Sequence, residues 1–184
     1  RLTPAPHIAF SDKDRGGDIM IRALGGYYET LRMGVPTGFN PFQLENTPRN
    51  REFLFELVQY LCLKENRTRL DPEEEDLVRS SVSKIMDYER QHRTAVNFHD
   101  LLQGASNKKA GDLSSRFNEW VQIDRMGWLF NNEEDQFSID PRIIGFDMTE
   151  VLESPRIRTA VLMYIFHRCE SKLKEDGTPA AYFI

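Results

Sequence analysis

The residues of this chain best suited to chemistry follow a short apolar run near its start. The charged stretch 12–15 (Asp-Lys-Asp-Arg) follows the apolar run 7–10 after one serine and precedes a pair of glycines. Carboxylates fixed at such a point can polarise water or orient a metal-bound water, and losing one such group costs about 10²-fold or more in rate. Asp12 and Asp14 are the carboxylates of this charged cluster, which is therefore the candidate functional site. The alternative is that they cap the next helix and form surface ion pairs.

A strand, a helix and a second strand position this stretch. Residues 7–10 predict a buried strand, and the 3.6-residue spacing of apolar side chains predicts a helix over 18–24. Gly25-Gly26 ends that helix, and the aromatic residues of 27–31 predict a second strand. Such a short strand–helix–strand unit is parallel, and ligands of open parallel sheets bind beyond the carboxyl ends of the strands.

The rest of the chain predicts a helical excursion followed by a return to the sheet. Helix-start signals at Thr47-Pro48, Asp71-Pro72 and Asp112 each precede an apolar helical stripe. A strand at 143–147, a helix from Ser154-Pro155 and a strand at 180–184 follow. The predicted fold is α/β with a parallel sheet, and its predicted parts are an α/β part over 1–46, a mostly helical insertion over 47–140 and a return to the α/β core over 141–184.

Composition excludes several classes of protein. The 184 residues carry a net charge of −5, which argues against an electrostatic grip on nucleic acid over the whole surface but leaves room for a local basic patch. No apolar run approaches the ~18 residues that a membrane span needs. The two cysteines lie in apolar helical patterns and favour a reduced, cytoplasmic protein. The histidines lack the i, i+4 spacing of a zinc site, and the chain contains neither GxSxG nor GxxxxGK[ST].

Several motifs, in order, resemble the large type IV secretion and conjugation ATPases of the CagE/TrbE kind. They cover almost the whole chain and are 10–17 (FSDKDRGG), 22–28 (RALGGYY), 37–41 (TGFNP), 127–132 (GWLFNN), 145–149 (GFDMT), 164–168 (YIFHR) and 177–184 (GTPAAYFI). The first three are similar to the run that follows the Walker A helix in that family. The last resembles the strand that carries the Walker B acids.

The resemblance implies a RecA-like P-loop NTPase core that binds ATP and Mg²⁺ and energises a bacterial secretion channel. It also implies a place at the cytoplasmic face of the inner membrane, other secretion components as partners, and a hexamer. The Walker A loop is expected before Arg1 and the Walker B acids after Ile184, so that these residues alone are expected to be an inactive fragment. The alternative is an interaction module whose helical part docks on other secretion components.

Under this resemblance, Asp12 and Asp14 are the candidate catalytic residues, which would polarise water or fix the lysine and Mg²⁺ near the nucleotide. Two arginines of the last helix, Arg158 and Arg168, are further candidates for nucleotide binding. They lie ten residues apart, which at ~100° per residue places them about 80° from a common face. One of them is expected to sense phosphate or to act between subunits. The alternative is that they pair with nearby acids such as Glu153 and Glu170.

Overall fold

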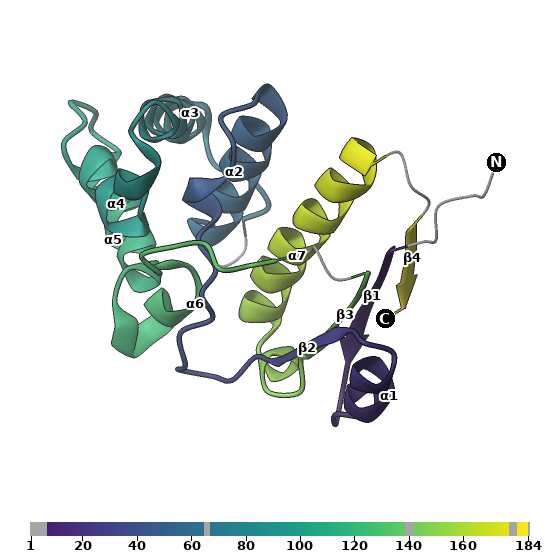
Figure 1. Ribbon diagram of the computed structural model, residues 1–184. Helices are drawn as coiled ribbons and strands as arrows, with labels where there is room; N and C mark the ends of the chain where they lie inside the picture. The colour runs from purple at the N-terminus through teal and green to yellow at the C-terminus, as the bar shows by residue number, and fades with distance from the viewer. Residues whose placement is uncertain (1–6, 65–66, 139–141, 177–179, 184) are drawn as a thin grey trace. The chain divides into compact units, whose positions relative to one another are not determined.

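The computed structural model describes residues 7–64, 67–138, 142–176 and 180–183. It contains two compact units, residues 1–33 with 138–184 and residues 34–137. The sheet unit holds β1 (His7–Asp12), α1 (Asp18–Ala23), β2 (Tyr27–Thr30), β3 (Ile143–Asp147), η5 (Val151–Glu153), α7 (Pro155–Asp176) and β4 (Ala180–Phe183) (Figure 1). The helical unit holds η1 (Pro41–Gln43), α2 (Pro48–Leu61), α3 (Pro72–Met86), η2 (Arg90–His92), α4 (Ala95–Gln103), α5 (Ala110–Phe117), η3 (Asn118–Trp120), the π-helix η4 (Ile123–Gly127) and α6 (Trp128–Phe130).

The strands of the sheet unit form one sheet in the order β2-β3-β1-β4, and every neighbouring pair is parallel. The predicted α/β class with a parallel sheet is confirmed. Strand β1 extends two residues beyond its predicted end at Phe10, because Ser11 and Asp12 continue the ladder opposite Phe146 and Asp147. The carboxyl ends of β1 and β3 are therefore adjacent, with Asp12 directly beside Asp147.

Helices α1 and α7 cover opposite faces of this sheet. A Cβ atom on Gly145 would point toward Ile21 of α1, whereas the next residue, Phe146, lines a small apolar space with Leu162 and Ile165 of α7. Successive residues of a strand face opposite sides, so the two helices lie on different faces. The loops that leave β1 and β3 thus diverge to opposite faces, and such a divergence leaves a crevice at the strand ends.

Glycine contacts hold α1 on the sheet. The helix is six residues long, and Ile21 is its buried side chain. A Cβ atom at Gly17, Gly26 or Gly145 would lie 3.3, 2.8 or 2.3 Å from side-chain atoms of Ile21, so these glycines make the room in which it packs. Gly25 has φ +75°, the left-handed conformation that was predicted to end this helix.

The helical unit starts two of its main helices where the sequence predicted. Thr47 accepts a hydrogen bond from the Asn50 amide (3.2 Å) ahead of α2, and Asp71 forms a capping box with Glu74 ahead of α3. The third predicted start was late: α5 begins at Ala110, and Asp112 lies inside its first turn. Among the described residues between Pro48 and Phe130 there is no strand. No helix of the described chain is long and apolar enough to cross a membrane.

Aromatic rings form the core of the helical unit and draw the preceding loop into it. Phe42 of η1 packs on Phe98 of α4 and Phe117 of α5, with ring centroids 5.2 and 6.3 Å away, and these two rings are 5.0 Å from each other. The helical unit accordingly spans residues 34 to 137. The predicted division of the chain at residues 47 and 140 stays a prediction.

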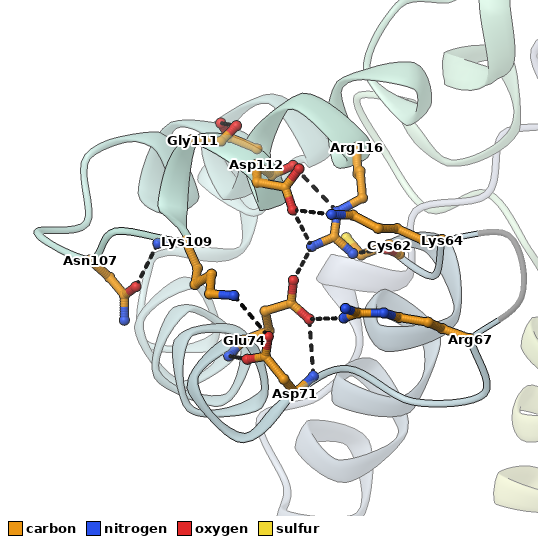
Figure 2. A network of polar contacts seen from close by, with 11 residues as sticks. Cys62, Lys64, Arg67, Asp71, Glu74, Asn107, Lys109, Gly111, Asp112 and Arg116 are labelled. Atoms are coloured by element: carbon orange, nitrogen blue, oxygen red, sulfur yellow. Dashed lines mark hydrogen bonds and ion pairs between the residues drawn. The ribbon is translucent and has the colours of Figure 1, made fainter.

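A buried polar network joins α3, α5 and the end of α2 (Figure 2). The Glu74 carboxylate is 1% exposed and accepts hydrogen bonds from Arg116 and from the Asp71 amide (3.0 Å). Arg116 also donates to the carbonyl of Cys62, and Arg67 lies 3.7 Å from Glu74. A buried carboxylate needs such partners, because an unpaired charge is costly to bury.

Candidate functional site at the carboxyl ends of β1 and β3

Asp147, the last residue of β3, is the centre of the polar cluster at the strand ends. The residue is 2% exposed. Its Oδ1 accepts hydrogen bonds from the amide (3.0 Å) and hydroxyl (2.5 Å) of Thr149, and its Oδ2 accepts one from Nε of Arg15 (3.0 Å). Burial raises the pKa of this carboxyl, but the bonds from Thr149 and Arg15 outweigh burial and leave the pKa below its usual value. Asp147 is therefore a carboxylate with both oxygens engaged.

The loop that follows β1 holds two residues in an uncommon backbone conformation. Asp14 and Arg15 have φ values of +64° and +58°, the left-handed region that side chains other than glycine rarely adopt. The Asp14 amide donates to the hydroxyl of Thr149 (2.7 Å), and Arg15 is fixed by Asp147. Contacts with the loop after β3 thus maintain this conformation, which is a feature that clusters at functional sites.

Two hydrogen-bond donors hold the carboxylate of Asp12 in place. Its Oδ2 accepts hydrogen bonds from the Gly17 amide (2.6 Å) and from the Tyr28 hydroxyl (2.7 Å). Tyr28 is on β2, two strands away, and its ring passes over Gly145, where a Cβ atom would lie 2.6 Å from the ring. Burial raises the pKa of the Tyr28 hydroxyl, and the Asp12 carboxylate raises it further, so the hydroxyl remains a donor.

An open cleft of about 290 Å³ lies beside this cluster. Its lining residues are Asp14, Arg15, Asp147, Thr149 and Glu150. Its charged groups are the guanidinium of Arg15, which is bonded to the Asp147 carboxylate, and the two further carboxylates of Asp14 and Glu150. The described residues contain no group of three or more His, Cys, Asp or Glu side chains placed to hold a metal ion. The cleft thus offers one guanidinium and two carboxylates, but no complete metal site within the described residues.

The predicted site residues divide between this cleft and α7. Asp14 lines the cleft, and Asp12 lies beneath it within the hydrogen-bonded cluster. Arg158 donates to the carbonyl of Leu152 (3.5 Å), and Arg168 donates to the hydroxyl of Tyr164 (3.0 Å) and lies over its ring. Neither arginine is among the residues that line the cleft. A catalytic or nucleotide-binding role for these four residues stays a prediction.

Sequence reasoning gave no role to Asp147 and Thr149, although it placed both in a motif at the end of a predicted strand. The available signal was the Asp-x-Thr spacing after an apolar strand, since a threonine two residues after an aspartate can donate to its carboxylate. What the sequence could not give was the β1–β3 pairing, which sets Asp147 beside Asp12 across 135 residues.

Two other motifs meet in the helical unit and have a structural role there. The Thr37 hydroxyl donates to the Leu129 carbonyl (2.6 Å), Asn40 Nδ2 to the Asn132 carbonyl (2.7 Å) and Asn132 Nδ2 to the Phe39 carbonyl (2.9 Å). The segments 37–41 and 127–132 thereby satisfy each other's backbone groups in a buried region. The polar side chains of these two motifs therefore stabilise the fold of the helical unit.

A larger hollow, of about 850 Å³, lies on the helical unit. Its charged lining residues are Glu89, Arg90, Glu133, Glu134 and Asp135. Four carboxylates face one guanidinium there, so the hollow would repel an anionic ligand such as a nucleotide more strongly than the cleft beside Asp147.

Comparison with known proteins identifies the relatives of this chain. No family model matches it. The chain is 34% identical over 162 residues to protein virB4 of Rhizobium radiobacter, and 30% identical over 184 residues to the type IV secretion system protein virB4 of Brucella abortus. These matches cover 88% and 95% of this chain but 20% and 22% of the relatives.

The fold is also that of a solved relative. The structure of VirB4 of Thermoanaerobacter pseudethanolicus matches 97% of this chain and 53% of its own with a TM-score of 0.72, at 14% sequence identity. The chain spans about a fifth of the length of the curated relatives that it matches. Over most of its length, the chain is therefore homologous to the virB4 proteins of type IV secretion systems.

Proposed function

We propose that this chain is the central part of a RecA-like, ATP-hydrolysing motor that energises a bacterial type IV secretion system. The observation that carries the proposal is the polar cluster at the adjacent ends of β1 and β3. It combines a strained loop, an oriented guanidinium and a cleft, at the edge where open parallel sheets bind ligands. The relatives whose names include a type IV secretion system support the biological setting.

The residues of the cleft fit one side of a nucleotide site. Arginine binds phosphate oxygens through its planar fork of donors. Mg²⁺ usually binds through one or two carboxylates together with waters and phosphate oxygens, and Asp14 is the residue of this chain that we assign to that environment. Bound Mg²⁺ would neutralise the phosphate charge. Asp12 supports the loop that carries Asp14 through its bond to Gly17.

We propose that the 184 residues alone are inactive, since they contain no GxxxxGK[ST] phosphate loop, and Asp14 and Glu150 repel a nucleotide that no such loop holds. In the full-length protein we propose ATP and Mg²⁺ as ligands, a hexamer, other secretion components as partners, and a position at the cytoplasmic face of the inner membrane. The secreted cargo would be protein or DNA.

The test is ATP hydrolysis by the full-length protein and by its Asp14→Asn variant. Asparagine keeps the size of the side chain but removes the charge, so turnover is expected to fall about 10²-fold while the melting temperature stays unchanged. The control is Glu75→Gln in the first turn of α3, which is expected to be near neutral. A full-length protein without ATPase activity, or an Asp14→Asn variant with normal turnover, would contradict the proposal for this site.

A further inference from the structure

The side chain of Arg15 has a firmly held inner end and an accessible outer end. Its Nε donates to Oδ2 of Asp147 at 3.0 Å, and Asp147 is buried and held in place by Thr149. The Arg15 side chain is nevertheless 54% exposed and lines the cleft. Among the described residues, no partner is found for its two terminal nitrogens.

Arg15 binds its carboxylate differently from Arg79, which pairs with Glu52 through both terminal nitrogens (2.8 and 3.1 Å). Arg22 also binds its carboxylate, Asp18, through Nε, but one of its terminal nitrogens donates to the Tyr28 carbonyl (3.0 Å). In Arg15 the bond to Asp147 at Nε leaves both terminal nitrogens able to bind a second anion. A guanidinium presents five N–H donors in a fixed plane, and one bond at Nε fixes the direction of the rest.

The backbone conformation adds to this orientation. Arg15 lies in the left-handed region at φ +58°, next to Asp14 at φ +64°. Two successive residues in this region cost free energy, which the bonds from Thr149 and Asp147 offset. The loop therefore directs Arg15 toward the cleft before any ligand arrives, and preorganised donors lose little free energy in reorganisation when charge develops on a ligand.

We infer that Arg15 binds the phosphates of the nucleotide and that Asp147 is the positioning residue that holds its guanidinium for this contact. The inference rests on the proposed ATPase function and specifies which side chain of this cleft meets the anionic ligand. Arg15 is the cationic residue that lines it. Asp147 does not touch the ligand; it acts by binding Nε and leaving the two terminal nitrogens for phosphate oxygens.

The experiment measures steady-state ATP hydrolysis and Mg-ATP binding by the full-length protein, four single variants and one double variant. Arg15→Gln removes the charge and the fork, and is expected to lower kcat/KM about 10²-fold. Because the buried Asp147 also loses its cation, the melting temperature is expected to fall, so all variants are assayed well below their melting temperatures. Arg15→Lys keeps the charge but has a single nitrogen in place of the planar fork, so it cannot hold Asp147 at one nitrogen while two others meet phosphate oxygens, and it is expected to restore only a small part of the loss. The matched control is Arg79→Gln, an arginine of similar exposure (49%) with a carboxylate partner, expected to leave kcat/KM unchanged.

A double variant tests the positioning role. If Asp147 acts through Arg15, then Asp147→Asn lowers kcat/KM in the wild type but has no further effect in the Arg15→Gln background. A purely structural Asp147 would give losses that multiply in the double variant, and that result would overturn the inference. Should Asp147→Asn fail to fold, Arg15→Lys decides: wild-type kcat/KM with lysine would show that charge alone suffices and that no positioning is needed.

The two proposals fail in different ways. A wild-type full-length protein that neither binds nor hydrolyses ATP would refute the ATPase function. An active wild type whose Arg15→Gln variant stays within about threefold in kcat/KM would refute the phosphate contact alone.

Discussion

Gly145 allows one side of the candidate site to form. The Tyr28 ring crosses it to reach Asp12, and Ile21 of α1 packs against the same position. Because Asp12 in turn accepts the Gly17 amide, the path of the chain after β1 depends on this crossing. The absence of a side chain at one residue of β3 thus helps to fix the loop that carries Asp14 and Arg15.

Replacing Gly145 with alanine is expected to destabilise the sheet unit. The new Cβ atom would lie 2.3 Å from Ile21 Cδ1 and 2.6 Å from Tyr28 Cδ2, so both side chains must shift. Such overpacking costs typically about 1–3 kcal/mol. The control is Gly111→Ala in α5, where nothing lies within 4 Å, which is expected to stabilise the protein by up to about 1 kcal/mol. Denaturant unfolding measures the stability of both variants. An unchanged midpoint for Gly145→Ala would contradict the close packing of Tyr28 and Ile21 against Gly145.

The lowered pKa of the Asp147 carboxyl predicts that the stability of the fold depends on pH. The pKa of its carboxyl lies below the usual value in the folded protein, so the ionised group stabilises the fold above the unfolded value of about 3.9. This contribution is lost as the pH falls through the lower, folded-state pKa. The melting temperatures of wild type and Asp147→Asn should therefore differ by a constant amount from pH 7 to about pH 4.5 and converge below that. A difference that persists unchanged to pH 3 would argue against a stabilising carboxylate.

The sequence predicted one part of the candidate site because that part is local. Asp12 and Asp14 follow a strand directly, so their place at its carboxyl end needs no knowledge of the fold. The role of Asp147 depends on which strand pairs with β1, and no spacing along the chain encodes that. The helix over 18–24 was also predicted, but the apolar pairs that revealed it face outward: Ile19 is 84% and Leu24 is 62% exposed, and Ile21 is buried instead.

At the scale of elements, the polar network around Glu74 ties together helices that are distant in sequence. Glu74 lies on α3 and Arg116 on α5, and the Arg116 bond to the Cys62 carbonyl adds the end of α2. That carbonyl belongs to the last turn of a helix, where the chain has no intrahelical donor to offer. The network therefore satisfies a helix end and a buried charge together.

Removing Arg116 is expected to destabilise the helical unit strongly. Arg116→Met keeps the bulk of the stem but leaves Glu74, which is 1% exposed, without its nearest cation. Breaking a buried pair typically costs about 3–5 kcal/mol, and we expect the low end because Arg67 and the Asp71 amide remain. Adding Glu74→Gln should recover part of the loss. Arg79→Met, whose partner Glu52 is exposed, should cost about 1 kcal/mol or less by the same unfolding measurement.

Helix starts were predictable where the chain contains its own cap. Thr47-Pro48 and Asp71-Pro72 satisfy backbone amides within three residues, so the signal and the structure coincide. The start of α5 was placed two residues late because Lys109 provides no side-chain cap and Asp112 forms ion pairs with Lys64 and Arg116 instead. An acid near a helix start is thus ambiguous until its partners are known.

At the scale of the molecule, the helical unit is closed at its own ends. The Gln136 amide donates to the Gly38 carbonyl (2.8 Å), and Phe137 packs edge-on against Phe39 with centroids 5.4 Å apart. Gly38 has φ +73°, and a Cβ atom there would lie 2.9 Å from the Gln136 side chain, so glycine permits this approach. Ends that meet are typical of a segment inserted into a host domain.

Residues 34–137 are therefore expected to fold without the rest of the chain. They have their own aromatic core, a buried ion network and ends bonded to each other. Expressed alone, this segment should unfold in one cooperative thermal transition with helical circular dichroism. Asn40→Ala should lower its melting temperature, because the buried Asn40 amide donates to the carbonyls of Arg93 and Asn132. A gradual, non-cooperative loss of signal would show that the segment depends on the sheet unit for its stability.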